Sequence, residues 1–240
     1  MAKEHVKAIV FDVFGTVVDW RTSVIAELAA FGRGRGITRD WEAFADDWRG
    51  LYQPSLEEVR SGRRDWTILD ALHRESLVTL LDRSGIEGLA DHEIEHLTRI
   101  WHRLRPWPDS VEGLHRLKRR YIIGTLSNGN VGLLTRLAKF AGLPWDVILS
   151  AETARAYKRQ REAYLRNLEL LNLHPHEVML AAAHNDDLEA ASSAGLRTAF
   201  VVRPNEYGPR QSKDLAAERA WDVVTDSFLG LADAMGCERS

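Results

Sequence analysis

The second half of the chain alternates short apolar runs with helical patterns, and this constrains the fold more than any other feature. The clearest runs are short, rich in β-branched residues and almost uncharged, as central strands of a parallel sheet are: Val6–Phe11, Tyr121–Leu126, Glu177–Ala182 and Arg197–Val202, with weaker candidates at Asp146–Leu149 and Trp221–Thr225. Helical patterns separate them: Val131–Ala141, Glu162–Leu171, Leu188–Ala194 and Ser227–Ala234. This order predicts βαβ units, and therefore an α/β fold with a doubly wound parallel sheet.

The stretch between the first strand and Trp107 shows helical periodicity only. Its patterns are Val24–Phe31, Trp41–Tyr52, Trp66–Leu81 and His92–Leu104. A crossover between parallel strands needs only about a dozen residues, so we expect a separate helical cap domain over residues 19–105, inserted into a core domain formed by residues 1–18 and 106–240. Residues 32–36 (GRGRG) are expected to form a flexible loop between cap helices. Two prolines then return the chain to the core, where Ser110 or Asp109 is expected to cap the next helix.

Composition excludes several classes of function. Of the 240 residues, 45% are hydrophobic and 28% are charged, and the net charge is −3, so no broad basic field for a nucleic-acid partner is expected. No apolar stretch approaches about 18 residues, which argues against a membrane span. The single cysteine is Cys237. A disulfide within one chain is therefore impossible, and a cytoplasmic location is expected.

Polar side chains gather where the predicted strands end. Asp12 directly follows the first strand, and Gly15 and Thr16 form a tight turn beside it. Ser127 and Asn128 follow the strand Tyr121–Leu126 and precede a helix. In open α/β sheets, ligands bind at the carboxyl ends of the strands, so these groups are candidates for a shared site. The simpler alternatives are a turn-stabilising aspartate and a helix cap.

Two further elements carry candidate groups. Lys158 stands in a basic run (KRQR, residues 158–161) and is either a cation that stabilises the Asp12 carboxylate or a solvated surface lysine. The strand Glu177–Ala182 is followed by a loop that presents one imidazole, one amide and two carboxylates: His184, Asn185, Asp186 and Asp187. Favourable placement of an acid at a helix N-terminus explains one of the two aspartates. It does not explain why four polar side chains stand together in this loop.

Taken in order, the segments FDVFGT, LSNGN, YK and HNDDL resemble the motifs of the haloacid dehalogenase superfamily, and in particular of the type II L-2-haloacid dehalogenases. The resemblance implies that Asp12 attacks C2 of a small 2-substituted carboxylic acid, displaces the leaving group and forms an ester that water then hydrolyses. It implies no cofactor and a possible homodimer. It also implies roles for other residues: Lys158 orients Asp12; Thr16, Ser127 and Asn128 hold the substrate carboxylate and the oxyanion; Asp187 helps to position the water; and Arg49 binds halide, the alternative being an exposed arginine on an amphipathic helix. The aromatic candidates for the walls of a dry pocket are Phe14, Trp20, Trp48 and Tyr52, with ordinary core packing as the simpler alternative for each.

Departures from the family pattern limit the reactions that we expect the site to catalyse. Phosphatases of the superfamily resemble DxDGT, but Phe14 occupies the place of their second aspartate, and Ala183 replaces the first acid of the fourth motif. The usual Mg²⁺ site is therefore expected to be incomplete, so we expect no metal. A phosphatase and a non-enzymatic binding protein remain as less favoured readings. The serines usual in the fourth motif are also absent, so His184 or Asn185 is expected to take over the positioning of water.

Asp186 suggests a second substrate. An additional carboxylate beside the site does not help to expel a halide, but it suits a cationic group. The strained ring of L-azetidine-2-carboxylate carries such a group, and hydrolases of this compound resemble the same family. The alternative function is therefore ring opening to 4-amino-2-hydroxybutyrate, again through Asp12. The simpler reading of Asp186 is a solvated acid at the start of a helix.

Overall fold

A six-stranded parallel sheet forms the centre of the computed structural model, which describes residues 5–237. Its strand order is β5-β4-β1-β6-β7-β8. The strands are β1 (Ala8–Phe11), β4 (Ile122–Ser127), β5 (Val147–Ser150), β6 (Val178–Ala182), β7 (Arg197–Val201) and β8 (Val223–Thr225). Each of them overlaps one of the six predicted strands, so the predicted parallel sheet is confirmed.

Strand β1 lies inside the sheet, paired with β4 along one edge and with β6 along the other, and all four of its residues are buried. Ile9 and Phe11 pack into one part of the hydrophobic core, while Ala8 and Val10 pack into another. A strand covered on both faces needs apolar residues at every position, which explains the continuous run in the sequence. The strand therefore holds the following residue, Asp12, at the middle of the sheet's carboxyl edge.

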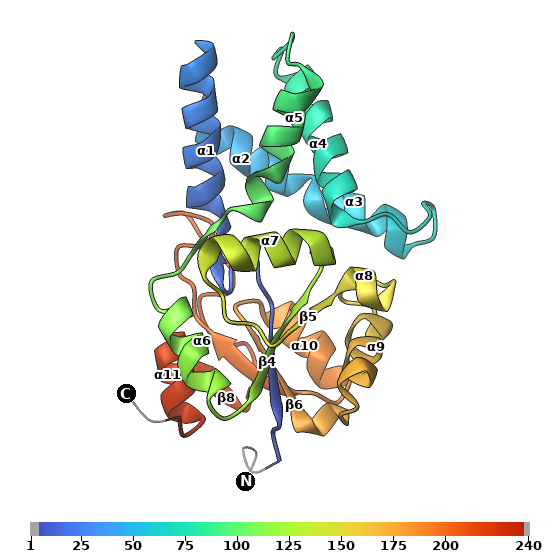
Figure 1. Ribbon diagram of the computed structural model, residues 1–240, viewed down its shortest axis with the longest axis vertical. Coiled ribbons are helices and arrows are strands. Elements are labelled where there is room, and N and C mark those ends of the chain that lie inside the picture. Colours follow the sequence, from blue (N-terminus) through green and yellow to red (C-terminus); the bar gives the residue numbers. More distant parts are fainter. Residues whose placement is uncertain (1–4, 238–240) are drawn as a thin grey trace.

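Helices cover both faces of the sheet, as a doubly wound fold requires (Figure 1). α6 (Ser110–Lys118) and α11 (Phe228–Ala234) pack together on one face, and α9 (Arg161–Leu171) and α10 (Asn185–Ser193) lie on the other. The remaining core helices are α7 (Val131–Ala141), α8 (Ala151–Ala154) and η2 (Pro175–Glu177). Within residues 5–237, no helix is long and apolar enough to cross a membrane.

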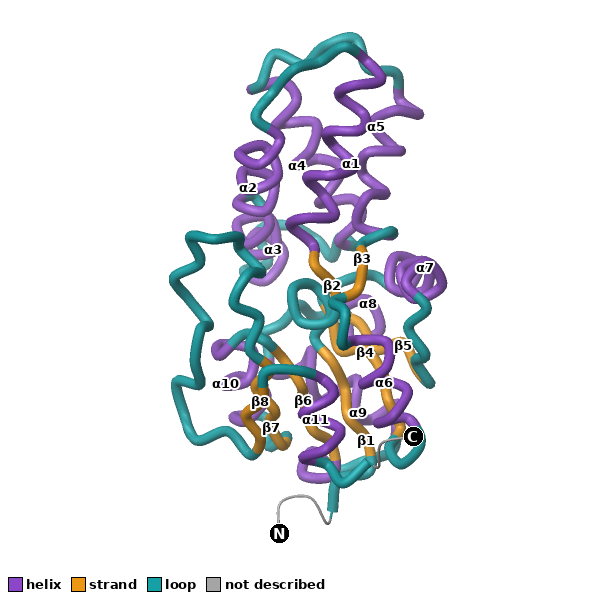
Figure 2. Tube along the Cα trace, turned by 90° about the vertical axis from the view of Figure 1, so that its left-hand side faces the viewer, coloured by secondary structure: helices purple, strands orange, loops and turns teal. Residues whose placement is uncertain are grey.

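A second layer of helices stands beyond the carboxyl edge of the sheet (Figures 1 and 2). It contains α1 (Trp20–Arg35), α2 (Trp41–Gly50), α3 (Tyr52–Arg60), α4 (Leu69–Arg83), α5 (Asp91–Thr98) and η1 (Arg99–His102). The chain leaves the core through β2 (Val18–Asp19) and returns through β3 (Arg105–Pro106), and these two strands pair antiparallel. We propose that this layer is the cap domain, with the boundaries 19–105 expected from the sequence.

The glycine-rich segment 32–36 is not a loop, and this prediction was wrong. Helix α1 continues through it to Arg35 and ends at Gly36, whose φ of 67° is left-handed. A Cβ on Gly32 would lie 2.3 Å from a ring carbon of Trp41. The glycines therefore allow close packing and a helix end, two uses that composition alone does not distinguish from flexibility.

Three other local predictions need correction. The pattern Trp41–Tyr52 is two helices, because the chain breaks at Leu51 between α2 and α3. The pattern His92–Leu104 ends as the 3₁₀ helix η1. Neither Asp109 nor Ser110 caps α6 with its side chain: Asp109 instead pairs with Arg203, and Ser110 Oγ donates to a backbone carbonyl. Both side chains therefore contact distant parts of the chain, although the local pattern predicted that one of them caps the helix.

Candidate active site

The Asp12 carboxylate is buried and held by three side chains from different parts of the core. Thr16 Oγ1 donates to Oδ2 at 2.8 Å, and Lys158 Nζ lies 3.1 Å from Oδ1. His184 Nδ1 lies 3.2 Å from Oδ2. Burial acts to raise the pKa of Asp12, but Lys158, His184 and Thr16 more than offset it and hold this pKa well below its usual range. Asp12 is therefore ionised, as a nucleophile must be.

Lys158 is a buried ion-pair partner, not a solvated surface lysine. Its exposed fraction is 6%, and its ammonium lies between Asp12 and Asp187, 2.6 Å from Oδ2 of the latter. Its backbone N–H donates to Asn128 Oδ1 at 2.8 Å, which ties the segment to the end of β4. Burial lowers the pKa of Lys158, but the two carboxylates raise it further, so the ammonium stays charged.

Asp187 is fully engaged on both oxygens. Oδ2 accepts from Lys158, and Oδ1 accepts from the Tyr164 hydroxyl at 2.6 Å. Tyr164 belongs to α9, which packs beside α10. The sequence predicted that Asp187 helps to position water, but the geometry makes it the counter-ion that holds Lys158 in place.

His184 bridges Asp12 and a carboxylate that the sequence did not single out. Its Nε2 lies 3.0 and 2.9 Å from the two carboxylate oxygens of Glu206, and the exposed fraction of Glu206 is only 1%. Trp20 Nε1 also donates to Glu206, at 3.2 Å. Gly15 leaves room for this carboxylate, since a Cβ there would lie 2.1 Å from Glu206 Oε1. The turn after Asp12 therefore requires glycine for space as well as for its φ of 88°.

The two other polar members of the fourth motif do not face Asp12. The Asn185 amide donates to Asp214 and to the Ala216 carbonyl, and its oxygen accepts from Glu218 and Trp221. Its expected role with the hydrolytic water is therefore not supported. Asp186 lines the cavity rim but pairs with Arg159, and its side chain is 56% exposed.

The three groups expected to hold the substrate carboxylate and the oxyanion do not all lie at the cavity. Thr16 binds Asp12 and also accepts the Ala183 N–H, and Ser127 Oγ accepts the Gly129 N–H. Neither of these hydroxyl residues is among those that line the cavity, whereas Asn128 is, and its amide donates to the Tyr52 hydroxyl at 2.9 Å. Of the three, only Asn128 is placed to meet a substrate.

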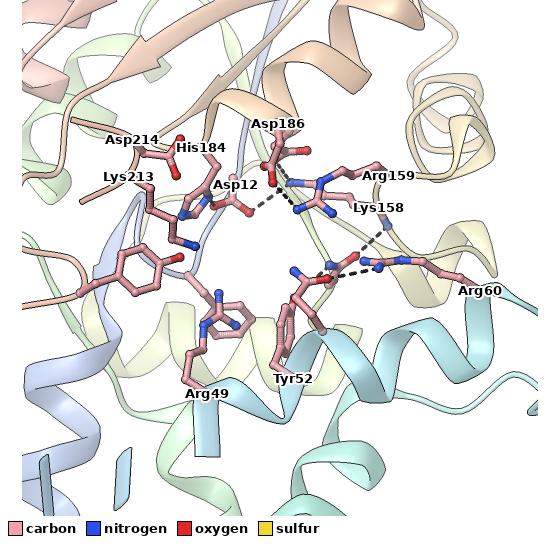
Figure 3. A pocket seen from close by; sticks show the side chains of 15 residues that line it. Asp12, Arg49, Tyr52, Arg60, Lys158, Arg159, His184, Asp186, Lys213 and Asp214 are labelled. Atoms are coloured by element: carbon pink, nitrogen blue, oxygen red, sulfur yellow. Dashed lines mark hydrogen bonds and ion pairs between the residues drawn. The ribbon is translucent and has the colours of Figure 1, made fainter. Parts of the chain in front are cut away.

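Side chains from α2 and α3 close the cavity opposite Asp12 (Figure 3). Arg49 points into it and lies over the Tyr52 ring, with its guanidinium carbon 4.1 Å from the ring centroid. Arg49 Nη1 is buried and has no hydrogen-bond partner among the described residues. A buried N–H group without a hydrogen-bond partner is unfavourable in free energy, so the Arg49 guanidinium is suited to bind an anion. Phe14 also lines the cavity, Trp20 lines the adjoining one, and Trp48 packs in the cap core.

The cavity itself is small, about 70 Å³. A buried water needs about 10–15 Å³ by this measure, so the space suits a molecule of a few heavy atoms. A larger adjoining cavity of about 360 Å³ shares Arg49, Tyr52 and Tyr207 with it. The small cavity beside Asp12 therefore adjoins a wider one.

A sequence model of the haloacid dehalogenase-like hydrolases matches residues 6–195. The chain belongs to this family. Among solved structures, a defluorinating L-2-haloacid dehalogenase is 50% identical with a TM-score of 0.95, covering 96% of this chain and 95% of that one. A second L-2-haloacid dehalogenase is 47% identical with a TM-score of 0.94, covering 97% and 100%. The (S)-2-haloacid dehalogenase of Xanthobacter autotrophicus is 29% identical over 204 residues, 82% of this chain and 76% of that protein.

Membership of the haloacid dehalogenase-like hydrolases confirms the resemblance carried by the four motifs and makes the chain a hydrolase. Phe14 and Ala183 fill two positions where metal-dependent members carry acids, as noted above. In the part of the chain that the structure describes, no group of three or more His, Cys, Asp or Glu side chains is arranged to hold a metal ion. The donor set therefore does not fit a Mg²⁺ site.

The site of this haloacid dehalogenase-like hydrolase contains residues that sequence reasoning missed. Glu206, Tyr207, Lys213 and Asp214 all lie in the long loop between β7 and β8, which rises beside the sheet toward the cap (Figure 2). Tyr207, Lys213 and Asp214 line the cavity, as do Gln53 and Arg60 of α3. The loop has no periodic pattern. The only available signal was its length, since long ordered loops in compact domains commonly serve function.

Proposed function

We propose that the protein is a 2-haloacid dehalogenase that acts on short L-2-haloacids through an ester at Asp12. The observation that carries the proposal is the small cavity with an ionised carboxylate, Asp12, at one side and, at the other, the Arg49 guanidinium, whose buried Nη1 has no hydrogen-bond partner among the described residues. These are the two groups that a displacement needs: a nucleophile, and an acceptor for the departing anion. The relatives described above, which are L-2- and (S)-2-haloacid dehalogenases, support the same substrate class.

The first half-reaction is a displacement at C2. An oxygen of Asp12 forms a bond to C2 of the substrate while the carbon–halogen bond breaks, and the halide leaves with the bonding electrons. Lys158 keeps the Asp12 carboxylate ionised and oriented before attack. Asn128 is the proposed contact for the substrate carboxylate, and Phe14 and Tyr52 limit the space around C2.

The second half-reaction is hydrolysis of the ester. Water attacks the side-chain carboxyl carbon of Asp12, and the bond from that carbon to the ester oxygen on C2 breaks. The products are a 2-hydroxy acid and a restored Asp12 carboxylate that carries one oxygen from water. The ring-opening alternative relied on a free charge at Asp186, and the pairing of this residue with Arg159 removes that support.

Single turnover with L-2-chloropropionate in ¹⁸O-labelled water tests the proposal. We expect stoichiometric chloride release, ¹⁸O in the Asp12 side chain by peptide mass spectrometry, and unlabelled first-turnover product. A parallel incubation with L-azetidine-2-carboxylate should show no ring opening. Label confined to the product would contradict the ester, and turnover of the ring compound without halide release from any haloacid would favour the alternative.

Replacement of Arg49 by Met is expected to lower kcat/KM for L-2-chloropropionate about 100-fold. The variant loses a buried charge-assisted contact to the departing halide, and such contacts contribute about 1.5–3 kcal/mol. Steady-state chloride release measures the effect. Arg83→Met, at an exposed position of α4, is the matched control and should keep normal activity. An unchanged kcat/KM for the Arg49 variant would remove this residue from the mechanism.

A further inference from the structure

The ester formed on Asp12 needs a base that activates the hydrolytic water, and Asp187 does not fit this role. Both of its oxygens already accept short hydrogen bonds, from Lys158 and from Tyr164. Releasing the bond from Tyr164 would leave a buried hydroxyl without a partner. Releasing the bond from Lys158 would leave this buried ammonium without a charged partner once Asp12 is esterified, which is also costly. The base must therefore be another group that faces the Asp12 carboxyl.

His184 faces that carboxyl directly and is held by a second carboxylate behind it. Its Nδ1 lies 3.2 Å from Asp12 Oδ2, and its Nε2 lies within 3.0 Å of both oxygens of Glu206. Glu206 is itself fixed by the Trp20 indole and by close packing on Gly15. In neutral His184, a proton on Nε2 shared with Glu206 leaves the Nδ1 lone pair directed at the reacting carboxyl.

On the basis of the proposed function, we propose that His184 is the general base of the second half-reaction and that Glu206 positions it. His184 Nδ1 takes a proton from water as the water oxygen bonds to the carboxyl carbon of the Asp12 ester. The bond between that carbon and the ester oxygen, which came from Asp12 and stays on C2, then breaks, and the proton on Nδ1 passes to this oxygen to give the 2-hydroxy acid. The second water proton leaves the restored Asp12 carboxyl for solvent. The whole reaction thus consumes one water and releases one halide and one proton.

The charges around His184 make this base available only after the first step. The carboxylates in contact with it are Asp12, directly after β1, and Glu206 on the β7–β8 loop. Lys158 lies beyond Asp12. The other charged groups that line the same cavity are Arg49 and Arg60 of the cap, Arg159, Asp186, Asp187, Lys213 and Asp214. Burial lowers the pKa of His184, but the two carboxylates raise it well above its usual range. Esterification removes the charge of Asp12, which favours transfer of the imidazolium proton to solvent and frees the lone pair. When hydrolysis restores the Asp12 carboxylate, His184 regains a proton from solvent, so the cycle as a whole still releases one proton.

Rapid-quench kinetics with L-2-chloropropionate test the proposal in Glu206→Gln and His184→Asn. We expect both variants to keep a chloride burst of one equivalent, while steady-state turnover falls about 100-fold or more, as loss of a general base or of its positioning partner does. Intact-mass spectrometry should show the ester accumulating on Asp12. Glu206→Asp should restore part of the turnover. In Glu206→Gln the limb of the pH profile that reports His184 should move to lower pH, because a carboxylate that raises the pKa of this imidazole is gone, and in His184→Asn this limb should be absent.

Glu218→Gln is the matched control, because Glu218 is an exposed residue of the same loop; it should behave as the wild type. If Glu206→Gln slows the burst as much as the turnover, with no accumulated ester, the residue acts before hydrolysis and the proposal is overturned. If Glu206→Gln fails to fold, His184→Asn decides by the same criterion.

The proposed function and the role of His184 fail in different ways. A wild-type enzyme that shows neither the chloride burst nor the adduct on Asp12 would contradict the proposed function. A wild-type enzyme that shows both, with variants that turn over at the wild-type rate, would contradict only the role of His184 and Glu206.

Discussion

Asp12→Asn is expected to lower kcat/KM for L-2-haloacids by about 10⁴-fold or more, the range seen when a nucleophile is removed from an enzyme. The amide is nearly the same size as the carboxylate, so Thr16 and Gly15 can keep their places. It is a poor nucleophile, however, and cannot form the ester. Chloride release in the steady state and in a single turnover measures the loss.

Two further measurements separate loss of chemistry from loss of structure. Asp82→Asn, at an exposed position of α4, is the matched control and should retain full activity. The Asp12 variant should still bind the product 2-hydroxy acid, because the cavity walls and Arg49 are unchanged. Residual turnover within tenfold of the wild type would show that another group performs the displacement.

Lys158→Met is expected to lower the free energy of unfolding at pH 7 by about 3–5 kcal/mol, the cost of removing one partner of a buried ion pair. Lys158 is the cation between two buried carboxylates, Asp12 and Asp187. Without it, burial disfavours both charges, and activity should fall together with stability. Urea unfolding measures the change, and Lys139→Met, at an exposed position of α7, should stay within about 0.5 kcal/mol of the wild type.

The stability difference should depend on pH with a definite sign. The folded-state pKa of Asp12 lies below its ordinary value of 3.8, so its ionised form stabilises the wild type fully above about pH 3.8. This contribution is lost as pH falls through the lowered value. We therefore expect the gap between wild type and Lys158→Met to be large at pH 7 and to narrow in acid. The narrowing should begin only below about pH 3.8, and a gap that shows no decrease between about pH 3.8 and about pH 2 would contradict the assignment.

Local patterns in the sequence were enough to predict the core of the fold. A strand buried on both faces must be apolar throughout, so β1 was visible in the residues Val6–Phe11. The change from this pattern to long helical periodicity indicated the inserted helical layer. Asp12 was predicted as the reactive group because the carboxyl end of a central parallel strand is where such folds bind ligands. These features depend on short-range periodicity and on chain order, which the sequence carries directly.

Only the tertiary structure decided what surrounds Asp12. Glu206 reaches His184 across 22 residues and Trp20 across 186, and no periodic pattern links positions so far apart. Asn185 turns toward the β7–β8 loop, although it stands beside His184 in the sequence. The Arg49 guanidinium lies over the Tyr52 ring across the break between α2 and α3 at Leu51, a break that the continuous helical pattern concealed. The packing of elements that are distant in the sequence determines which side chains contact each other. The sequence was therefore enough to predict the reactive groups, but their contacts depend on the tertiary structure.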